Sequence, residues 1–122
     1  MNLVFVYGSL KKGFHNHRIL ERSECVGRGS VDNANLYSLG SFPALVNGGG
    51  VVKGEVYEAD EETMSRLDTL EGHPNFYRRE THLVEMNGMQ GKLPCHVYIY
   101  QGRVRDESHI PSGDWSHEHL RS

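Results

Sequence analysis

Apolar residues follow spacings typical of β-strands along much of the chain. Residues 3–7 form a short apolar run, rich in β-branched and aromatic side chains, that stops at Gly8 and therefore indicates a buried strand. Residues 51–58 alternate between two faces, with Val52 and Val56 on the same one, and indicate another strand. A sheet is therefore the expected main element of the fold.

Further strands are expected beside loops rich in glycine and asparagine. Residues 76–86 and 92–100 indicate two strands joined by a turn that contains Asn87-Gly88. Residues 44–46 predict a short strand, and the Asn-Gly-Gly-Gly segment at residues 47–50 predicts a flexible reversal. Because glycines recur within the strand-like segments, we expect bulges or bends of the kind found at the corners of a small barrel.

The segment between Asp60 and Gly72 predicts the main helix. Asp60 can cap its N-terminus, Gly72 can end it, and Met64 and Leu67 begin an apolar stripe at three-residue spacing. Residues 16–24 could hold a second, brief helix. Many short strands with one long helix predict a small α+β domain built on a strongly bent sheet or barrel.

Length, charge and cysteine content exclude several classes of protein. At 122 residues we expect one domain over residues 1–115, followed by a flexible tail at residues 116–122. The net charge is −3 and no basic run exceeds two residues, so nucleic-acid binding is not expected.

Neither the apolar runs nor the two cysteines indicate a membrane or an oxidising compartment. No apolar stretch approaches the roughly 18 to 20 residues of a membrane span, and no secretory signal is present. Cys25 and Cys95 form no CxxC pair and are interpreted as ordinary thiols. A cytoplasmic protein is therefore expected, of unknown oligomeric state.

The junction of the first strand and the following loop is a candidate binding site. Gly8 allows a sharp change of backbone direction, which can aim the N–H groups of neighbouring residues into one concavity that binds a carboxylate or phosphate. The alternative is a plain glycine turn. Ser9 could also serve a Ser-His-acid hydrolase, but it lacks the Gly-x-Ser-x-Gly elbow.

Glu71 breaks a local rule, because it places a carboxylate in the last turn of the predicted helix. The negative end of the helix dipole disfavours ionisation there and should raise the pKa of Glu71, which suits a general base. The alternative is an ion pair with Arg78 or Arg79.

Histidine pairs do not complete a metal site. His15 and His17, like His117 and His119, have the spacing of metal ligands, but each pair supplies only two. We therefore expect neither a metal nor another cofactor.

Several stretches between residues 7 and 115 occur together, in the same order, in one known family. They are Tyr7-Gly8-Ser9-Leu10-Lys11-Lys12-Gly13, Leu36-Tyr37-Ser38-Leu39-Gly40, Phe42-Pro43-Ala44-Leu45-Val46, Val52-Lys53-Gly54-Glu55-Val56-Tyr57, Ser112-Gly113-Asp114-Trp115 and, most specifically, residues 67–79. On these motifs the chain resembles the γ-glutamylcyclotransferase-like superfamily, in particular its short γ-glutamylamine cyclotransferase or AIG2-like branch. The resemblance implies a mixed β-barrel of about five to seven strands, flanked by one main helix and one or two short helices.

The resemblance also implies an enzyme that releases 5-oxoproline from a γ-glutamyl amine without a cofactor, by intramolecular aminoacyl transfer with a lyase-type outcome. Glu71 would be the general acid and base. The residues implied in substrate binding are Tyr7, Gly8, Ser9, Leu10 and Tyr77, with Phe42 and Arg78 as further candidates. Two alternatives remain: a protein of the same fold that binds a small carboxylate without turnover, and an enzyme that removes a γ-glutamyl protecting group from a biosynthetic intermediate.

Overall fold

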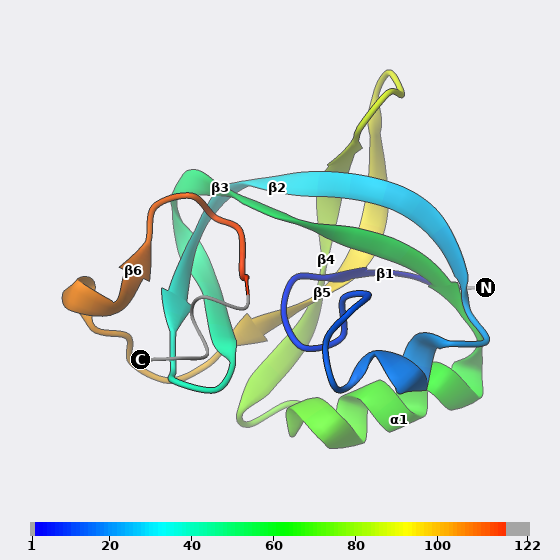
Figure 1. Ribbon diagram of the computed structural model, residues 1–122, viewed down its shortest axis with the longest axis horizontal. Helices are drawn as coiled ribbons and strands as arrows, with labels where there is room; N and C mark the ends of the chain where they lie inside the picture. Colours follow the sequence, from blue (N-terminus) through cyan, green and yellow to red (C-terminus); the bar gives the residue numbers. More distant parts are fainter. Residues whose placement is uncertain (1, 117–122) are drawn as a thin grey trace.

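The computed structural model describes residues 2–116 and contains one long helix, two short 3-10 helices and six strands within that range (Figure 1). In chain order these are β1 (Asn2–Val6), η1 (His17–Leu20), β2 (Glu24–Ser38), β3 (Pro43–Ala59), α1 (Glu61–Glu71), β4 (Tyr77–Met86), β5 (Lys92–Tyr100), η2 (Asp106–Ser108) and β6 (His109–Ile110). No helix within the described range is long and apolar enough to cross a membrane.

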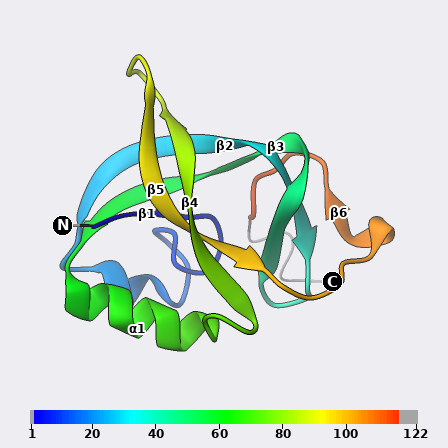
Figure 2. The ribbon, with the colours of Figure 1, turned by 180° about the vertical axis from the view of Figure 1, so that it is seen from behind.

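Five of the strands close into a barrel, which confirms the expected fold. They are hydrogen-bonded in the order β3-β1-β5-β4-β2, and a further pairing of β2 with β3 completes the circle, while β6 lies outside on β2. The sheet is mixed because β1 runs parallel to β5 and the other paired strands are antiparallel. In both ribbon views α1 lies beside the barrel, and the β4–β5 hairpin projects from it (Figures 1 and 2).

The predicted reversal at residues 47–50 is wrong. Strand β3 continues through these residues, and its register against β2 shifts between Asp32 and Ala34 instead of turning back. The backbone N–H of Gly50 donates to Oδ1 of Asn35 across the strand pair, at 3.0 Å. Residues 48–50 therefore form a bulge in the long β2–β3 hairpin. The side chain of Asn35 on the partner strand supplies the hydrogen bond that a regular ladder would have made.

Both faces of β1 are buried, which explains its uninterrupted apolar sequence. Phe5 belongs to the cluster of side chains packed inside the barrel, whereas Val4 and Val6 belong to a second cluster beneath α1. Met64 and Leu67 of the helix join that second cluster, as their spacing predicted. Successive side chains of a strand point to opposite faces, so β1 connects the barrel core to the helix.

The main helix begins and ends at the predicted residues. The carboxylate of Asp60 accepts the N–H of Thr63 at 2.8 Å, and Gly72 adopts a left-handed conformation with φ of 66°. Glu71 is therefore the last residue of α1. The brief helix expected within residues 16–24 is reduced to the 3-10 turn η1.

Candidate active site

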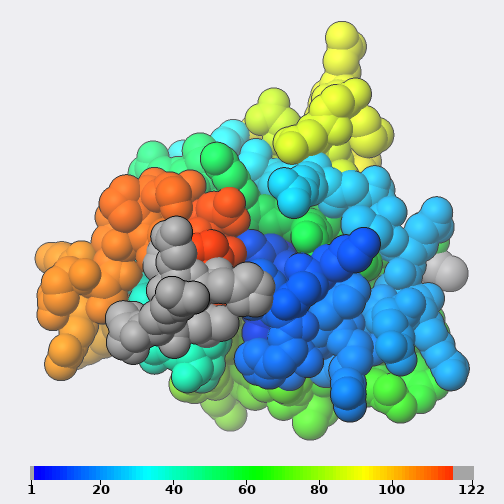
Figure 3. All heavy atoms as spheres, in the orientation of Figure 1, coloured from blue at the N-terminus to red at the C-terminus, as the bar shows by residue number. Residues whose placement is uncertain are grey.

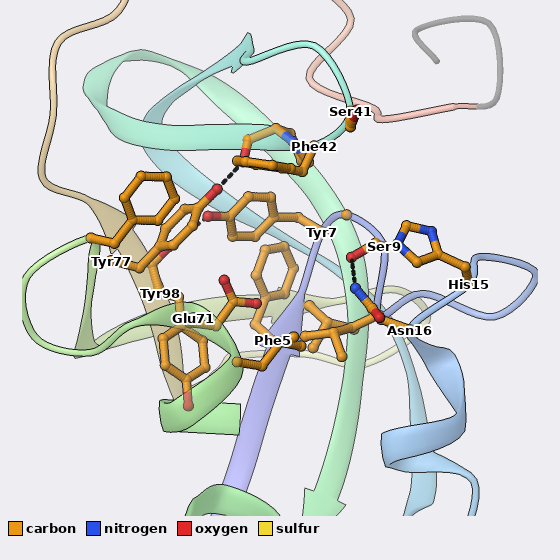
Figure 4. A pocket seen from close by; sticks show the side chains of 16 residues that line it. Phe5, Tyr7, Ser9, His15, Asn16, Ser41, Phe42, Glu71, Tyr77 and Tyr98 are labelled. Carbon is orange, nitrogen blue, oxygen red and sulfur yellow. Dashed lines mark hydrogen bonds between the residues drawn. The ribbon is translucent and has the colours of Figure 1, made fainter. Parts of the chain in front are cut away.

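A pocket of about 240 Å³ lies between the loop after β1, the end of α1, the start of β4 and the turn between β2 and β3 (Figure 4). In Figure 4 Ser9, His15 and Asn16 occupy one end of the view, Tyr77 the other, and the carboxylate of Glu71 extends between them toward the ring of Tyr7. The space-filling view shows the loop after β1, in blue, next to the green surface of α1 (Figure 3). Segments far apart in the sequence thus enclose one small cavity.

The loop after β1 lines this pocket with residues whose backbone N–H groups are unpaired within the described residues. Gly8, Ser9 and Leu10 all line it, and none of their N–H groups donates to an acceptor within residues 2–116. A Cβ at Gly8 would stand 2.7 Å from Cγ of Pro43, so only glycine allows the loop to lie this close to the β2–β3 turn. Unpaired N–H groups in a row can bind a carboxylate.

The hydroxyl of Ser9 has a structural partner. Its Oγ accepts a hydrogen bond from Nδ2 of Asn16 at 2.9 Å, and its carbonyl accepts from the N–H of the same residue at 3.0 Å. A carboxamide N–H cannot take a proton from a serine. This arrangement favours Ser9 as part of the backbone cradle over Ser9 as a nucleophile.

Two tyrosines form walls of the pocket, and their hydroxyls donate to backbone carbonyls. Tyr7 donates to the carbonyl of Tyr98, and Tyr77 donates to the carbonyl of Pro43, each at 2.6 Å. Burial raises the pKa of both phenols, so each remains protonated at neutral pH. Phe42 also lines the pocket, on the β2–β3 turn.

Among the described residues that line the pocket, Glu71 is the acidic one. Desolvation by burial raises its pKa to about 7. Neither arginine suggested as its partner pairs with it: Nη2 of Arg78 lies 2.6 Å from Glu80, and Nη2 of Arg79 lies 3.3 Å from Asp68. Arg78 does not line the pocket. Within the described residues, the carboxylate of Glu71 therefore has no hydrogen-bond or ion-pair partner.

Asp68 is a neighbour of the site that the sequence interpretation missed. It lies one helical turn before Glu71, where Oδ1 accepts from the hydroxyl of Tyr98 at 2.7 Å and Oδ2 pairs with Arg79. These contacts tie the last turns of α1 to β4 and β5. Its three-residue spacing from Glu71 was a usable signal, because such residues share a helix face.

The described part of the chain holds no cluster of three or more potential metal ligands. His15 lines the pocket, whereas Nδ1 of His17 lies 2.9 Å from the carbonyl of Leu10. His117 and His119, together with most of the expected tail, lie outside the described residues.

The fold and the pocket define a class of protein: a small mixed β-barrel with a glycine loop and a half-buried carboxylate in one pocket. A family model described as "Gamma-glutamyl cyclotransferase, AIG2-like" matches residues 4–117. The chain therefore belongs to this γ-glutamyl cyclotransferase family.

Relatives and solved structures agree with this assignment. The chain is 37% identical over 112 residues to the "Gamma-glutamylcyclotransferase family protein YtfP" of Escherichia coli K12, covering 92% of this chain and 94% of that one. It is 36% identical over 119 residues to the "Gamma-glutamylaminecyclotransferase" of Bos taurus, covering 88% and 71%. The crystal structure of an AIG2-like protein from Mus musculus superposes with a TM-score of 0.83 at 28% identity, covering 95% of this chain and 88% of that one.

Proposed function

We propose that this protein converts a γ-glutamyl amine into 5-oxoproline and the corresponding amine, with Glu71 as general acid and base. The observation that carries the proposal is the half-buried carboxylate of Glu71, which has no partner within residues 2–116 and whose pKa burial raises to about 7, in the same pocket as the N–H groups after β1 that are likewise unpaired in this range. An anion-binding loop can hold the α-carboxylate of the substrate, and a nearby base can activate its α-amine.

The reaction requires positioning and proton transfer. The N–H groups of Gly8, Ser9 and Leu10 bind the α-carboxylate, which places the α-ammonium group beside Glu71. Glu71 accepts a proton from that ammonium group, and the nitrogen lone pair attacks the γ-carbonyl carbon. The new C–N bond closes a five-membered ring, and the bond to the departing nitrogen breaks as Glu71 returns a proton to it. The ring nitrogen gives up its remaining extra proton, which the released amine takes up as it leaves in its ammonium form. Well-oriented intramolecular attack can lower the barrier by roughly 7 to 11 kcal/mol.

The activity is expected to rise with pH through about 7, because Glu71 must be ionised to accept a proton and its pKa is about 7. The profile of kcat/KM for a γ-glutamyl amide, measured between about pH 5 and pH 8, reports this group in the free enzyme. His15 is another ionisable side chain that lines the pocket, so His15→Asn is the control and should retain the rise. A flat profile, or loss of the rise in His15→Asn, would contradict the assignment.

Asp68 is expected to act as a positioning residue by holding Arg79 away from Glu71. In Asp68→Asn the guanidinium of Arg79 loses its carboxylate partner and can approach Glu71, which lowers the pKa of that base. We expect the rise in kcat/KM to shift down by roughly one pH unit, with kcat lower by about tenfold. Tyr98→Phe removes a hydrogen bond to Asp68 but leaves the ion pair, so its profile should not shift. An unshifted profile in Asp68→Asn would rule out this role.

A further inference from the structure

Three residues that line the pocket form an apolar surface that is partly open to solvent. Leu70, Phe76 and Phe42 all line the pocket, yet their side chains remain 43%, 45% and 38% exposed. The rings of Phe42 and Phe76 lie edge to face, with their centroids 6.1 Å apart. Exposed apolar residues gathered at a cavity opening, unlike scattered ones, indicate a surface that a ligand covers.

The position of Phe76 is held by the surrounding backbone and rings. Its N–H donates to the carbonyl of Gly72 at 2.9 Å, and its carbonyl accepts the N–H of Gln101 at 3.0 Å. Its ring packs edge to face against Tyr77 and Tyr100, with centroids 5.2 Å and 5.4 Å away. Phe76 is thus a preorganised wall five residues after Glu71, and a ligand group can contact it without first ordering it.

The pocket offers an acyl or amine substituent few charged partners. Backbone donors line the side formed by Gly8, Ser9 and Leu10, which suits the α-carboxylate. Within residues 2–116 the lining includes no lysine, arginine or aspartate, and its histidine, His15, lies with Ser9 and Asn16 at the end away from Tyr77 (Figure 4). Glu71 is required by the α-ammonium group. A charged group held against these side chains would therefore lose part of its hydration without gaining an ionic partner within the described residues, which is unfavourable.

From these observations we infer that the amine released by this protein carries a neutral, apolar alkyl or aryl group, which Phe42, Leu70 and Phe76 bind beside Glu71. The inference rests on the proposed function, because it assigns this surface to the leaving group of that reaction. Glu71 must reach the departing nitrogen to return a proton to it, and Leu70 is its neighbour in the chain. The substituent on that nitrogen is thereby directed to the apolar side.

The test compares amides of one chain length and different charge. The purified protein is incubated with γ-glutamyl-n-pentylamide, with the corresponding 5-aminopentylamide, and with the amide of 5-aminopentanoate, and 5-oxoproline is measured by mass spectrometry. The pentylamide is expected to exceed both charged amides in kcat/KM by at least roughly tenfold. Equal or faster turnover of either charged amide would overturn the inference while leaving the proposed reaction in place.

Variants of the wall give an independent readout. Phe76→Ala is expected to lower kcat/KM for the pentylamide roughly tenfold more than kcat/KM for the γ-glutamyl methylamide, because the methyl group is too short to use the wall. Leu83→Ala, an exposed residue on β4 that does not line the pocket, is the matched control and should affect neither substrate. An equal loss on both amides in Phe76→Ala would contradict the inference. If the unaltered protein forms no 5-oxoproline from any amide, methylamide included, the proposed function and this inference both fail.

Discussion

Glu71→Gln is expected to lower the rate of 5-oxoproline formation by roughly 100- to 10,000-fold, the usual contribution of a general acid–base group. Glutamine has nearly the same shape as glutamate but cannot accept the proton of the substrate ammonium group. The carboxylate has no partner within residues 2–116, so the substitution breaks no hydrogen bond or ion pair there. The measurement is kcat on a γ-glutamyl amide, followed by mass spectrometry of 5-oxoproline.

The same substitution is expected to stabilise the fold at alkaline pH, which separates loss of catalysis from loss of structure. Burial raises the pKa of Glu71 to about 7, above the ordinary value of 4.5, so ionisation is less favourable in the folded state. Above pH 7 the ionised, desolvated carboxylate therefore lowers the free energy of unfolding, whereas below about pH 4 it has no such effect. Glu71→Gln removes this destabilisation. Its Tm should exceed that of the unaltered protein at about pH 8 and match it near pH 4.

Glu62→Gln is the matched control for these measurements, because Glu62 belongs to the same helix and its side chain is 79% exposed. It should alter neither turnover nor the dependence of Tm on pH. Full turnover in a folded Glu71→Gln protein would contradict the assignment of Glu71 as general base. Lower stability of Glu71→Gln at alkaline pH would instead show that the carboxylate is engaged by a favourable contact.

Leu67→Ala is expected to destabilise the protein by about 2 to 5 kcal/mol, the range for truncating a fully buried leucine. Leu67 is 0% exposed and packs in the cluster beneath α1, together with Val4 and Leu20. Alanine leaves a cavity at the contact that holds the helix against the barrel. Urea denaturation monitored by circular dichroism gives the change in free energy of unfolding.

Leu70→Ala on the same helix is the control that separates loss of a buried side chain from a general effect of alanine in α1. Leu70 is 43% exposed, and alanine has slightly better helix propensity, so we expect a change within about 0.5 kcal/mol. Equal destabilisation by both substitutions would contradict the view that α1 is held by one buried stripe. Because Glu71 ends this helix, loosening the stripe should also displace the carboxylate and lower turnover of Leu67→Ala in native conditions.

Local chemistry made much of the fold predictable from the sequence. The cap at Asp60, the glycine stop at Gly72 and the buried strand before Gly8 depend on residues close in the chain, and each is confirmed. Glu71 was also identifiable, since an acid in the last helical turn opposes the helix dipole whatever surrounds it. The predicted reversal at residues 47–50 failed because its outcome depends on a side chain of another strand, Asn35.

The sequence by itself determined the strands, the helix with its ends, and the presence of an unusual acid at Glu71. Only the tertiary structure decided which charges meet. Arg78 and Glu80 stand two apart on β4 and so share a face, whereas Arg79 points to the other face, where it pairs with Asp68. Spacing along the chain cannot decide which acid each arginine pairs with, because a long cationic side chain can reach several carboxylates. The pleat of β4 and the packing of α1 against it leave Glu71 without a cationic partner among residues 2–116, and burial raises its pKa.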